Sequence, residues 1–203
     1  RVPADEDTAI NGCWQPGPGR ELFDTVRSEL GERPIIAEDL GTITPEVEAL
    51  RAGLGFPGMK VVQFGFSGDP TNPHALHNHV EHAVAYTGTH DNDTSVGWYG
   101  SLDEHTQHLV RVALSTAAED IAWEVIEAAW QSPADLAITP VQDLLSLGAE
   151  ARMNTPGTSA GNWRWRMEPG ALTPAVAARL RELTEACGRA TKSAAQETTS
   201  AVD

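Results

Sequence analysis

The sequence predicts an α/β fold built from about four βα units, and three observations support this. Short apolar runs rich in β-branched and aromatic residues occur at 34–37, 59–66, 82–88 and 135–139. Stretches with helical periodicity lie between them. Polar residues fall at or just beyond the ends of the runs, where the active sites of barrel enzymes are built: Glu38, Gln63, His90, Asp91, Gln142 and Asp143. Together these features favour half of a (β/α)8 TIM-type barrel over a small doubly wound sheet.

Helices are expected on both sides of the first apolar run. Residues 20–30 place apolar side chains on one helical face, and Gly31 supplies a stop. After the run, Thr44 and Pro45 have the residue types of a helix N-cap and a first helical position. A glycine-rich stretch then ends that second helix.

The second half of the chain carries a longer helical stretch, at about 102–130, with a break near Ser115. Thr116 and Glu119 have the spacing of a capping box, which predicts that a new helix starts there. A final helix is expected from Thr173 to Ala186.

Composition narrows the classes of function. The 203 residues carry a formal net charge of −15 and no basic patch, so a nucleic-acid partner is not expected. No apolar run approaches the length of a membrane span, so no membrane partner is expected either. Cys13 and Cys187 lie far apart, which favours a reducing, cytoplasmic setting. The opening residues lack an initiator Met and resemble a mid-protein loop, so we expect a fragment.

Two stretches concentrate carboxylates. In "PIIAEDLG" (34–41) a short apolar run ends in Glu38 and Asp39, so the predicted strand holds an acid that loses hydration and can keep its proton. In "YTGTHDNDTSVGWY" (86–99) a strand is followed by His90, Asp91 and Asp93 among small residues. That second stretch suits a polar ligand, or it is a solvated loop of turn-forming residues.

Three long motifs in order give a resemblance to a known family. The stretch 34–66, the stretch 86–99 and "RMNTPGTSAGNWRWRM" (152–167) closely resemble the amylomaltases, the 4-α-glucanotransferases of glycoside hydrolase family 77. The resemblance covers roughly residues 1 to 187 and implies the last four strands of that family's catalytic barrel. It also implies an enzyme without a cofactor or a metal, which transfers α-1,4-glucan segments between maltooligosaccharides and retains the anomeric configuration.

The resemblance implies roles for individual residues. Glu38, in "AEDLG", matches the family's catalytic acid/base, and Asp91, in "THDND", matches the carboxylate that stabilises the transition state and holds ring hydroxyls. Substrate binding is expected of four further residues: His90, Phe64, Asn92 and Asn154.

The sequence departs from the family pattern at two places. The family's nucleophile is an Asp in an Arg-Ile-Asp-His-Phe-type motif, and this chain has no such motif. Ser67 stands where relatives often carry an acid, with Asp69 close by. The chain is therefore expected to need the N-terminal half of the barrel. The alternative is a glucan-binding fragment without turnover.

Two further patterns each have two readings. In "NWRWR" (162–166) alternation places Trp163 and Trp165 on one face of an extended segment, where they either contact glucan or pack between the barrel and the last helix. Five histidines lie between 74 and 90, a density that would suit a metal-dependent hydrolase. Their spacing does not match a common ligand pattern, so the metal reading is the weaker one. We expect residues 1–187 to belong to the catalytic barrel and residues 188–203 to be a disordered tail.

Overall fold

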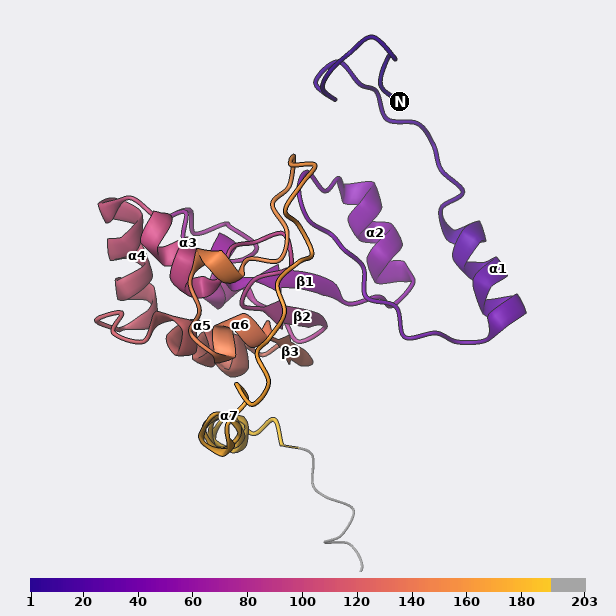
Figure 1. The fold of residues 1–203 in the computed structure, drawn as a ribbon. Coiled ribbons are helices and arrows are strands. Elements are labelled where there is room, and N and C mark those ends of the chain that lie inside the picture. The colour runs from indigo at the N-terminus through magenta and orange to yellow at the C-terminus, as the bar shows by residue number, and fades with distance from the viewer. Residues whose placement is uncertain (191–203) are drawn as a thin grey trace, which may run out of the picture. The chain divides into compact units, whose positions relative to one another are not determined.

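In the computed structural model, which describes residues 1–190, three of the four predicted strands form one sheet. They are β1 (Gly58–Val61), β2 (Ala83–Tyr86) and β3 (Leu136–Ile138), hydrogen-bonded in the order β1-β2-β3 (Figure 1). Strands β2 and β3 run parallel, with Ala85 opposite Ala137. The fold is therefore α/β, and its small sheet contains a parallel strand pair, as predicted.

The first predicted strand is not a strand in the structure. Residues 34–37 have an irregular conformation, and the amide of Ala37 makes a single backbone bond to the Pro57 carbonyl, at 3.0 Å. Pro34 has no amide hydrogen to donate, and Ile36 is exposed. One hydrogen bond and one half-buried side chain on Ile35 do not make a ladder, so an apolar run alone misled the prediction.

The chain divides into two units, Arg1–Gly58 and Met59–Asp203. The first unit contains α1 (Arg20–Leu30) and α2 (Pro45–Gly53), as predicted, with Thr44 and Pro45 at the start of α2. Neither helix buries a residue fully. They are linked by a hydrogen bond from Arg20 Nη2 to the Gly53 carbonyl, at 2.7 Å.

The second unit contains the sheet and most of the helices. The predicted long helical stretch is two helices, α4 (Glu104–Leu114) and α5 (Ile121–Gln131), and the break at Ser115 is a left-handed residue with φ 53°. The predicted capping box is absent. Thr116 Oγ1 accepts a hydrogen bond from the Ala118 amide in a local turn, and α5 starts later, after Asp120. The final helix, α7 (Pro174–Ala186), starts after Thr173 as predicted.

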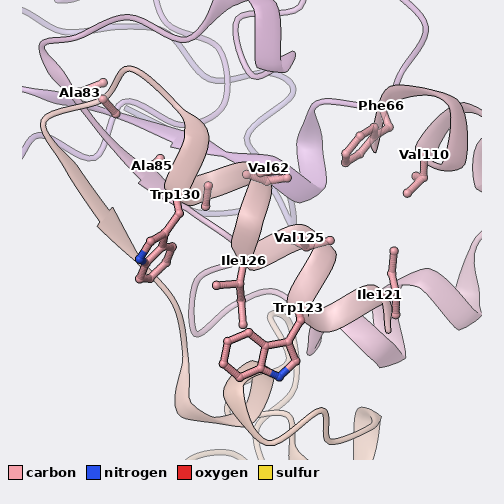
Figure 2. Close-up of a cluster of buried hydrophobic side chains, with 13 residues drawn as sticks. Val62, Phe66, Ala83, Ala85, Val110, Ile121, Trp123, Val125, Ile126 and Trp130 are labelled. Atoms are coloured by element: carbon pink, nitrogen blue, oxygen red, sulfur yellow. The ribbon is translucent and has the colours of Figure 1, made fainter. Parts of the chain in front are cut away.

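Helix α5 forms the centre of the core because it is apolar on almost all sides. Eight of its eleven residues are buried, and Val125, Ile126 and Ala129 have no exposed surface. Figure 2 shows Ile126 and Trp130 near Val62 and Ala85, which come from the sheet region. The sheet thus rests on α5, and its strand ends carry the loops described below.

Two short α-helices were not predicted from the sequence. Helix α3 (Ser95–Ser101) begins inside the stretch 86–99 that was expected to be loop, and the Thr94 hydroxyl caps it by accepting a hydrogen bond from the Gly97 amide. Helix α6 (Val141–Leu144) follows β3 after Pro140. In the described part of the chain no helix is long and apolar enough to cross a membrane.

Only residues 188–190 of the tail predicted at 188–203 are among the described residues. Arg189 is ordered, and its guanidinium donates hydrogen bonds to the carbonyl of Trp130, in the last turn of α5, and to those of Ser132 and Ala134, which follow the helix. The expectation of disorder from residue 191 onward lies outside the described residues.

Candidate functional site

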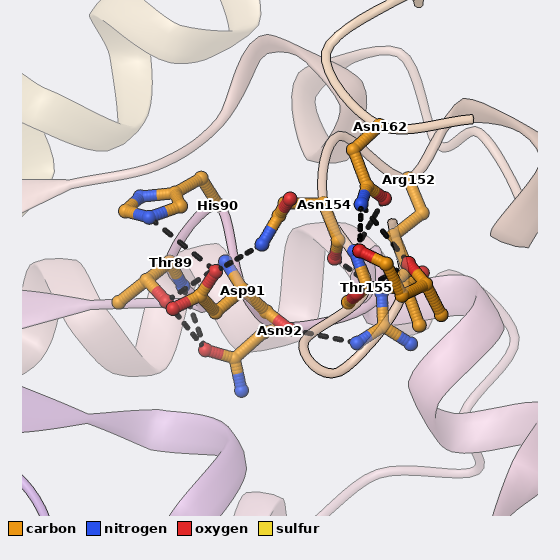
Figure 3. A network of polar contacts seen from close by, with 9 residues as sticks. Thr89, His90, Asp91, Asn92, Arg152, Asn154, Thr155 and Asn162 are labelled. Carbon is orange, nitrogen blue, oxygen red and sulfur yellow. Dashed lines mark hydrogen bonds and ion pairs between the residues drawn. The ribbon is translucent and has the colours of Figure 1, made fainter. Parts of the chain in front are cut away.

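The loop after β2 is folded by its own side chains. Asn92 Oδ1 accepts hydrogen bonds from the Thr89 amide and the Thr89 hydroxyl, both at 2.9 Å. The Thr89 hydroxyl oxygen in turn accepts from the Asp91 amide, at 3.2 Å. These local bonds are why Thr, Asn and Asp form a tight turn at this place. The turn presents His90 and Asp91 outward, and both are about half exposed (Figure 3).

A segment about sixty residues later in the sequence completes the cluster. Asn154 Nδ2 donates to Asp91 Oδ1 at 2.6 Å, and the Asn154 amide donates to the His90 carbonyl at 3.1 Å. Arg152 Nη2 donates to the Asp91 carbonyl at 2.7 Å, and Arg152 Nε to the Asn154 carbonyl at 2.8 Å. The structure therefore brings together four of the predicted residues, His90, Asp91, Asn92 and Asn154 (Figure 3).

The charges of this cluster suit a polyhydroxyl ligand. His90 Nε2 lies 3.4 Å from Asp91 Oδ1, so a protonated imidazole would form an ion pair with that carboxylate. Arg152 Nη1 lies 4.0 Å from Asp93 Oδ2 on the inner side of the loop. A carboxylate acceptor beside imidazole and amide donors can bond adjacent hydroxyl groups of one sugar ring.

Trp163 covers one side of the cluster. Its ring centroid lies 5.1 Å from that of His90, and its amide donates to the Met153 carbonyl at 2.8 Å. Its backbone is left-handed, with φ 62°, and its side chain is 54% exposed. A left-handed backbone is unfavourable for a bulky residue, and such strain is often found at binding sites.

A cavity of about 190 Å³ opens beside the loop, the imidazole and the indole. It is lined by residues of the loop after β2, of the segment after β3 and of the 152–163 region: Thr89, His90, Asn92, Asp93, Thr94, Pro140, Gln142, Arg152, Met153 and Trp163. Drug-sized ligands occupy pockets of about 300–1,000 Å³, so this cavity has room for part of a larger ligand.

The predicted alternation of "NWRWR" is not present. The positive φ at Trp163 turns the chain, so Trp163 is exposed while Trp165 is half-buried. Arg166 Nη1 donates to the carbonyls of Trp163 and Trp165 and so holds this turn. The ligand reading therefore fits Trp163 and the packing reading fits Trp165.

Phe64 lies apart from these contacts, at the end of a 3-10 turn (Val62–Phe64) after β1. Its ring packs edge-on against His74, with centroids 5.5 Å apart, and 43% of its surface is exposed. Nearby, Asp69 Oδ1 accepts from the Thr71 amide and hydroxyl, and these bonds lower the pKa of that carboxyl. Asp69 therefore stabilises a turn. That it replaces the acid which relatives often carry at the position of Ser67 stays a prediction.

Glu38 is exposed within the first unit, so the loss of hydration expected from the sequence is absent there. Its neighbour Asp39 is the restrained one, with Oδ2 3.3 Å from Arg51 Nε. The Arg51 guanidinium also donates to the Phe56 carbonyl, at 2.6 Å. The acidic pair at 38–39 thus combines one fixed and one accessible carboxylate.

The clustered histidines make separate contacts. His79 is buried between the Ser132 hydroxyl, 2.8 Å from Nδ1, and the His74 carbonyl, 3.0 Å from Nε2. His77 contacts the Pro70 carbonyl, and His82 lies 3.4 Å from Asp135. Within residues 1–190 no three His, Cys, Asp or Glu side chains lie together as metal ligands would.

The sequence analysis missed Arg152 as a site residue. It lies two positions before Asn154 in the quoted motif, and its long side chain reaches back to the loop after β2.

Two predicted polar residues at strand ends make hydrogen bonds to the backbone of segments that carry the site. Gln63 Nε2 donates to the Asp93 carbonyl at 3.0 Å, and Gln142 Nε2 donates to the Ala151 carbonyl at 3.2 Å.

Known proteins that are similar to this chain share one family description. The family described as 4-alpha-glucanotransferase matches residues 1–173. The 4-alpha-glucanotransferase of Thermus thermophilus is 47% identical over 196 residues, which are 93% of this chain and 39% of that protein. The chloroplastic/amyloplastic 4-alpha-glucanotransferase of Arabidopsis thaliana is 51% identical over 167 residues, 82% of this chain and 29% of that protein.

A solved structure gives the same result. The amylomaltase from Streptococcus agalactiae, determined in complex with acarbose, is 40% identical and superposes with a TM-score of 0.87. The match covers 94% of this chain and 39% of that chain, so the 203 residues span about two-fifths of such relatives. Because one family accounts for residues 1–173 and for both kinds of relative, the chain belongs to the 4-alpha-glucanotransferase family.

Proposed function

We propose that this chain supplies the acid/base and much of the sugar-binding side of a 4-alpha-glucanotransferase. The enzyme would transfer α-1,4-glucan segments from one maltooligosaccharide to another. The observation that supports this most directly is the cluster of His90, Asp91, Asn92 and Asn154 in a chain of this family. A relative with the same fold was solved with acarbose bound, which supports a sugar as ligand.

The proposed reaction has two steps with retention. A carboxylate nucleophile attacks the anomeric carbon while Glu38 gives its proton to the leaving glycosidic oxygen, so the old bond breaks and a glycosyl ester forms. Glu38 then takes the proton of an acceptor 4-hydroxyl, whose oxygen displaces the ester carboxylate. Asp91 and His90 hold ring hydroxyls as the ring flattens, and Asn92, Asn154 and Phe64 complete the binding surface.

The nucleophile is the missing partner in this scheme. Because the family's nucleophile motif does not occur in the sequence, we place that carboxylate on a segment outside these 203 residues. The sheet of three strands would be part of the C-terminal half of a (β/α)8 barrel, completed by the N-terminal half. A cytoplasmic location stays a prediction, since the Arabidopsis relative is named as chloroplastic/amyloplastic.

The test is Glu38→Gln in the complete enzyme that carries this sequence, assayed by glucose release from maltotriose. Turnover should fall by about two to three orders of magnitude, the scale of a lost general acid. A maltosyl fluoride donor, which needs no proton on its leaving group, should lose less in the first step. The exposed Glu29→Gln on α1 is the matched control and should leave turnover unchanged. Near-normal turnover by Glu38→Gln on maltotriose would refute the assignment.

The alternative is a chain that binds glucan without turning it over. Residues 1–203 expressed alone should release no glucose from maltotriose, because a glycosyl ester cannot form without its nucleophile. They should also associate, since β3 is an edge strand with Leu136 and Ile138 exposed. Gel filtration and a glucose assay measure both properties. A monomer with transfer activity would contradict the assignment of the nucleophile to another segment.

A further inference from the structure

Asp143 is a buried carboxylate that the proposed reaction does not use. It lies in the short helix α6 that follows β3, and only 1% of its surface is exposed. Oδ1 accepts from the Ser95 amide at 2.7 Å, while Oδ2 accepts from the Ser95 hydroxyl at 2.9 Å and the Thr87 hydroxyl at 2.7 Å. One side chain thus receives three hydrogen bonds from only two residues.

Those two residues are the ends of the site loop. Thr87 is the first residue after β2, and Ser95 is the first residue of α3. Every residue between them, including His90 and Asp91, belongs to the loop that carries the sugar-binding cluster. The Asp143 carboxylate therefore ties the exit of a strand to the start of a helix, beneath the functional turn.

A carboxylate at this place has an energetic disadvantage. Burial raises the pKa of Asp143, and the nearby Asp93 carboxylate acts in the same direction, while the bonds from Ser95 and Thr87 oppose the shift. No positive side chain is among these influences. A buried charge without a cation is unfavourable unless hydrogen bonds satisfy it. What offsets this cost is the set of three hydrogen bonds that the carboxylate accepts from Ser95 and Thr87. An apolar side chain at this position would hold neither residue.

We infer that Asp143 is a positioning residue for glucan transfer, which fixes the loop ends so that His90 and Asp91 meet the sugar in one geometry. This inference rests on the proposed function. Asp143 itself touches no reacting atom. It acts through Thr87 and Ser95, and a displacement of the loop by about 1 Å would reduce the rate by about a hundredfold.

The variants are chosen to separate positioning from stability, in the complete enzyme. Asp143→Ala removes all three bonds and should lower kcat about a hundredfold, with KM within about threefold. Asp143→Asn keeps the size and should lose less, because an amide still accepts from the Ser95 amide. Thr87→Val removes one anchor with little change of shape and should fall between. Val110→Ala, at the single buried residue of α4, is the control for stability alone.

Two readouts decide the outcome. The first is kcat, measured for each variant at a temperature that lies the same number of degrees below its melting temperature. The second is amide hydrogen exchange at residues 89–95. Faster exchange at Ser95 and in the loop is expected in Asp143→Ala and not in Val110→Ala. A kcat loss no larger than that of Val110→Ala, or unchanged exchange in the loop, would overturn the inference. If Asp143→Ala does not fold, Asp143→Asn and Thr87→Val carry the same comparison.

The same experiment separates this inference from the proposed function. If the unmodified enzyme transfers no glucan, the proposed function fails, while hydrogen exchange still shows whether Asp143 holds the loop. If the enzyme is active and the Asp143 variants keep a normal kcat, only the inference fails.

Discussion

The contact between Asn154 and Asp91 offers the sharpest test of the site. Asn154 Nδ2 donates to Asp91 Oδ1 at 2.6 Å, so Asn154→Asp places a second carboxylate about 3 Å from the first. Two unit charges at that distance repel by about 1.4 kcal/mol in water and about 5.5 kcal/mol at an effective dielectric constant of about 20. Because the Asp91 side chain is 47% exposed, the lower value is the better guide.

The repulsion predicts a change in the pH profile. Two adjacent carboxylates share a proton up to a higher pH than one carboxylate beside an amide. If transfer needs ionised Asp91, the acid limb of log kcat against pH should move upward by about one pH unit, since about 1.4 kcal/mol corresponds to one unit. Asn154→Ala loses the hydrogen bond that favours the ionised carboxylate but adds no charge, so its acid limb should move upward by less than that of Asn154→Asp.

The assay is glucose release from maltotriose by the complete enzyme, measured between about pH 4 and pH 8 for both variants. A falling rate with no shift of the acid limb in Asn154→Asp would mean that the added charge does not act on the carboxylate that transfer needs. An equal shift in Asn154→Ala would mean that the lost bond, not the added charge, is responsible. Either result would refute the reasoning.

Three further predictions concern catalysis and stability. Asp91→Asn should keep maltooligosaccharide affinity within a few-fold but reduce kcat by at least about a hundredfold, and a parallel loss of affinity would make Asp91 an ordinary binding residue. Burial lowers the pKa of His79 below its ordinary 6.5, so the unfolded chain takes up that proton more readily than the folded chain near pH 6. The free energy of unfolding, measured in urea, should therefore fall as pH drops below about 6.5, and His79→Gln should flatten that dependence. Arg189→Ala should lower the free energy of unfolding by about 2 kcal/mol or more, because three carbonyls at the end of α5 and just after it lose a charged donor. Arg181→Ala on the exposed face of α7 should change it by less than about 0.5 kcal/mol.

The sequence predicted the elements whose signals are local. Helix α1 has the bounds expected from its periodicity, and Thr44 with Pro45 marks the start of α2. The break near Ser115 was also predicted, although the capping box expected beside it is absent. The strand expected at 34–37 was wrong, since whether an apolar run pairs depends on a neighbour that the run itself does not encode.

The site was predicted in part, and its gaps have one physical cause. Residues 89–92 are adjacent in sequence, so their turn and its polar character could be recognised. Arg152 bonds that turn, and Asp143 bonds the two residues that flank it, Thr87 and Ser95, from about fifty to sixty residues away. No local pattern marks such contacts. The strained backbone of Trp163, which breaks the expected alternation, likewise depends on the Met153 carbonyl and the His90 ring.

The links between the turn at 89–92 and the segment 152–154 have a consequence for the thermodynamics of binding. Backbone and side-chain bonds already hold Asp91 and Asn154 in place, so binding of the proposed sugar ligand has few loop torsions to restrict. Ordering a residue's backbone costs about 1–2 kcal/mol, and here folding has absorbed that loss before any ligand is present. Affinity at this surface should therefore reflect hydroxyl contacts and displaced water, with little penalty from conformational entropy.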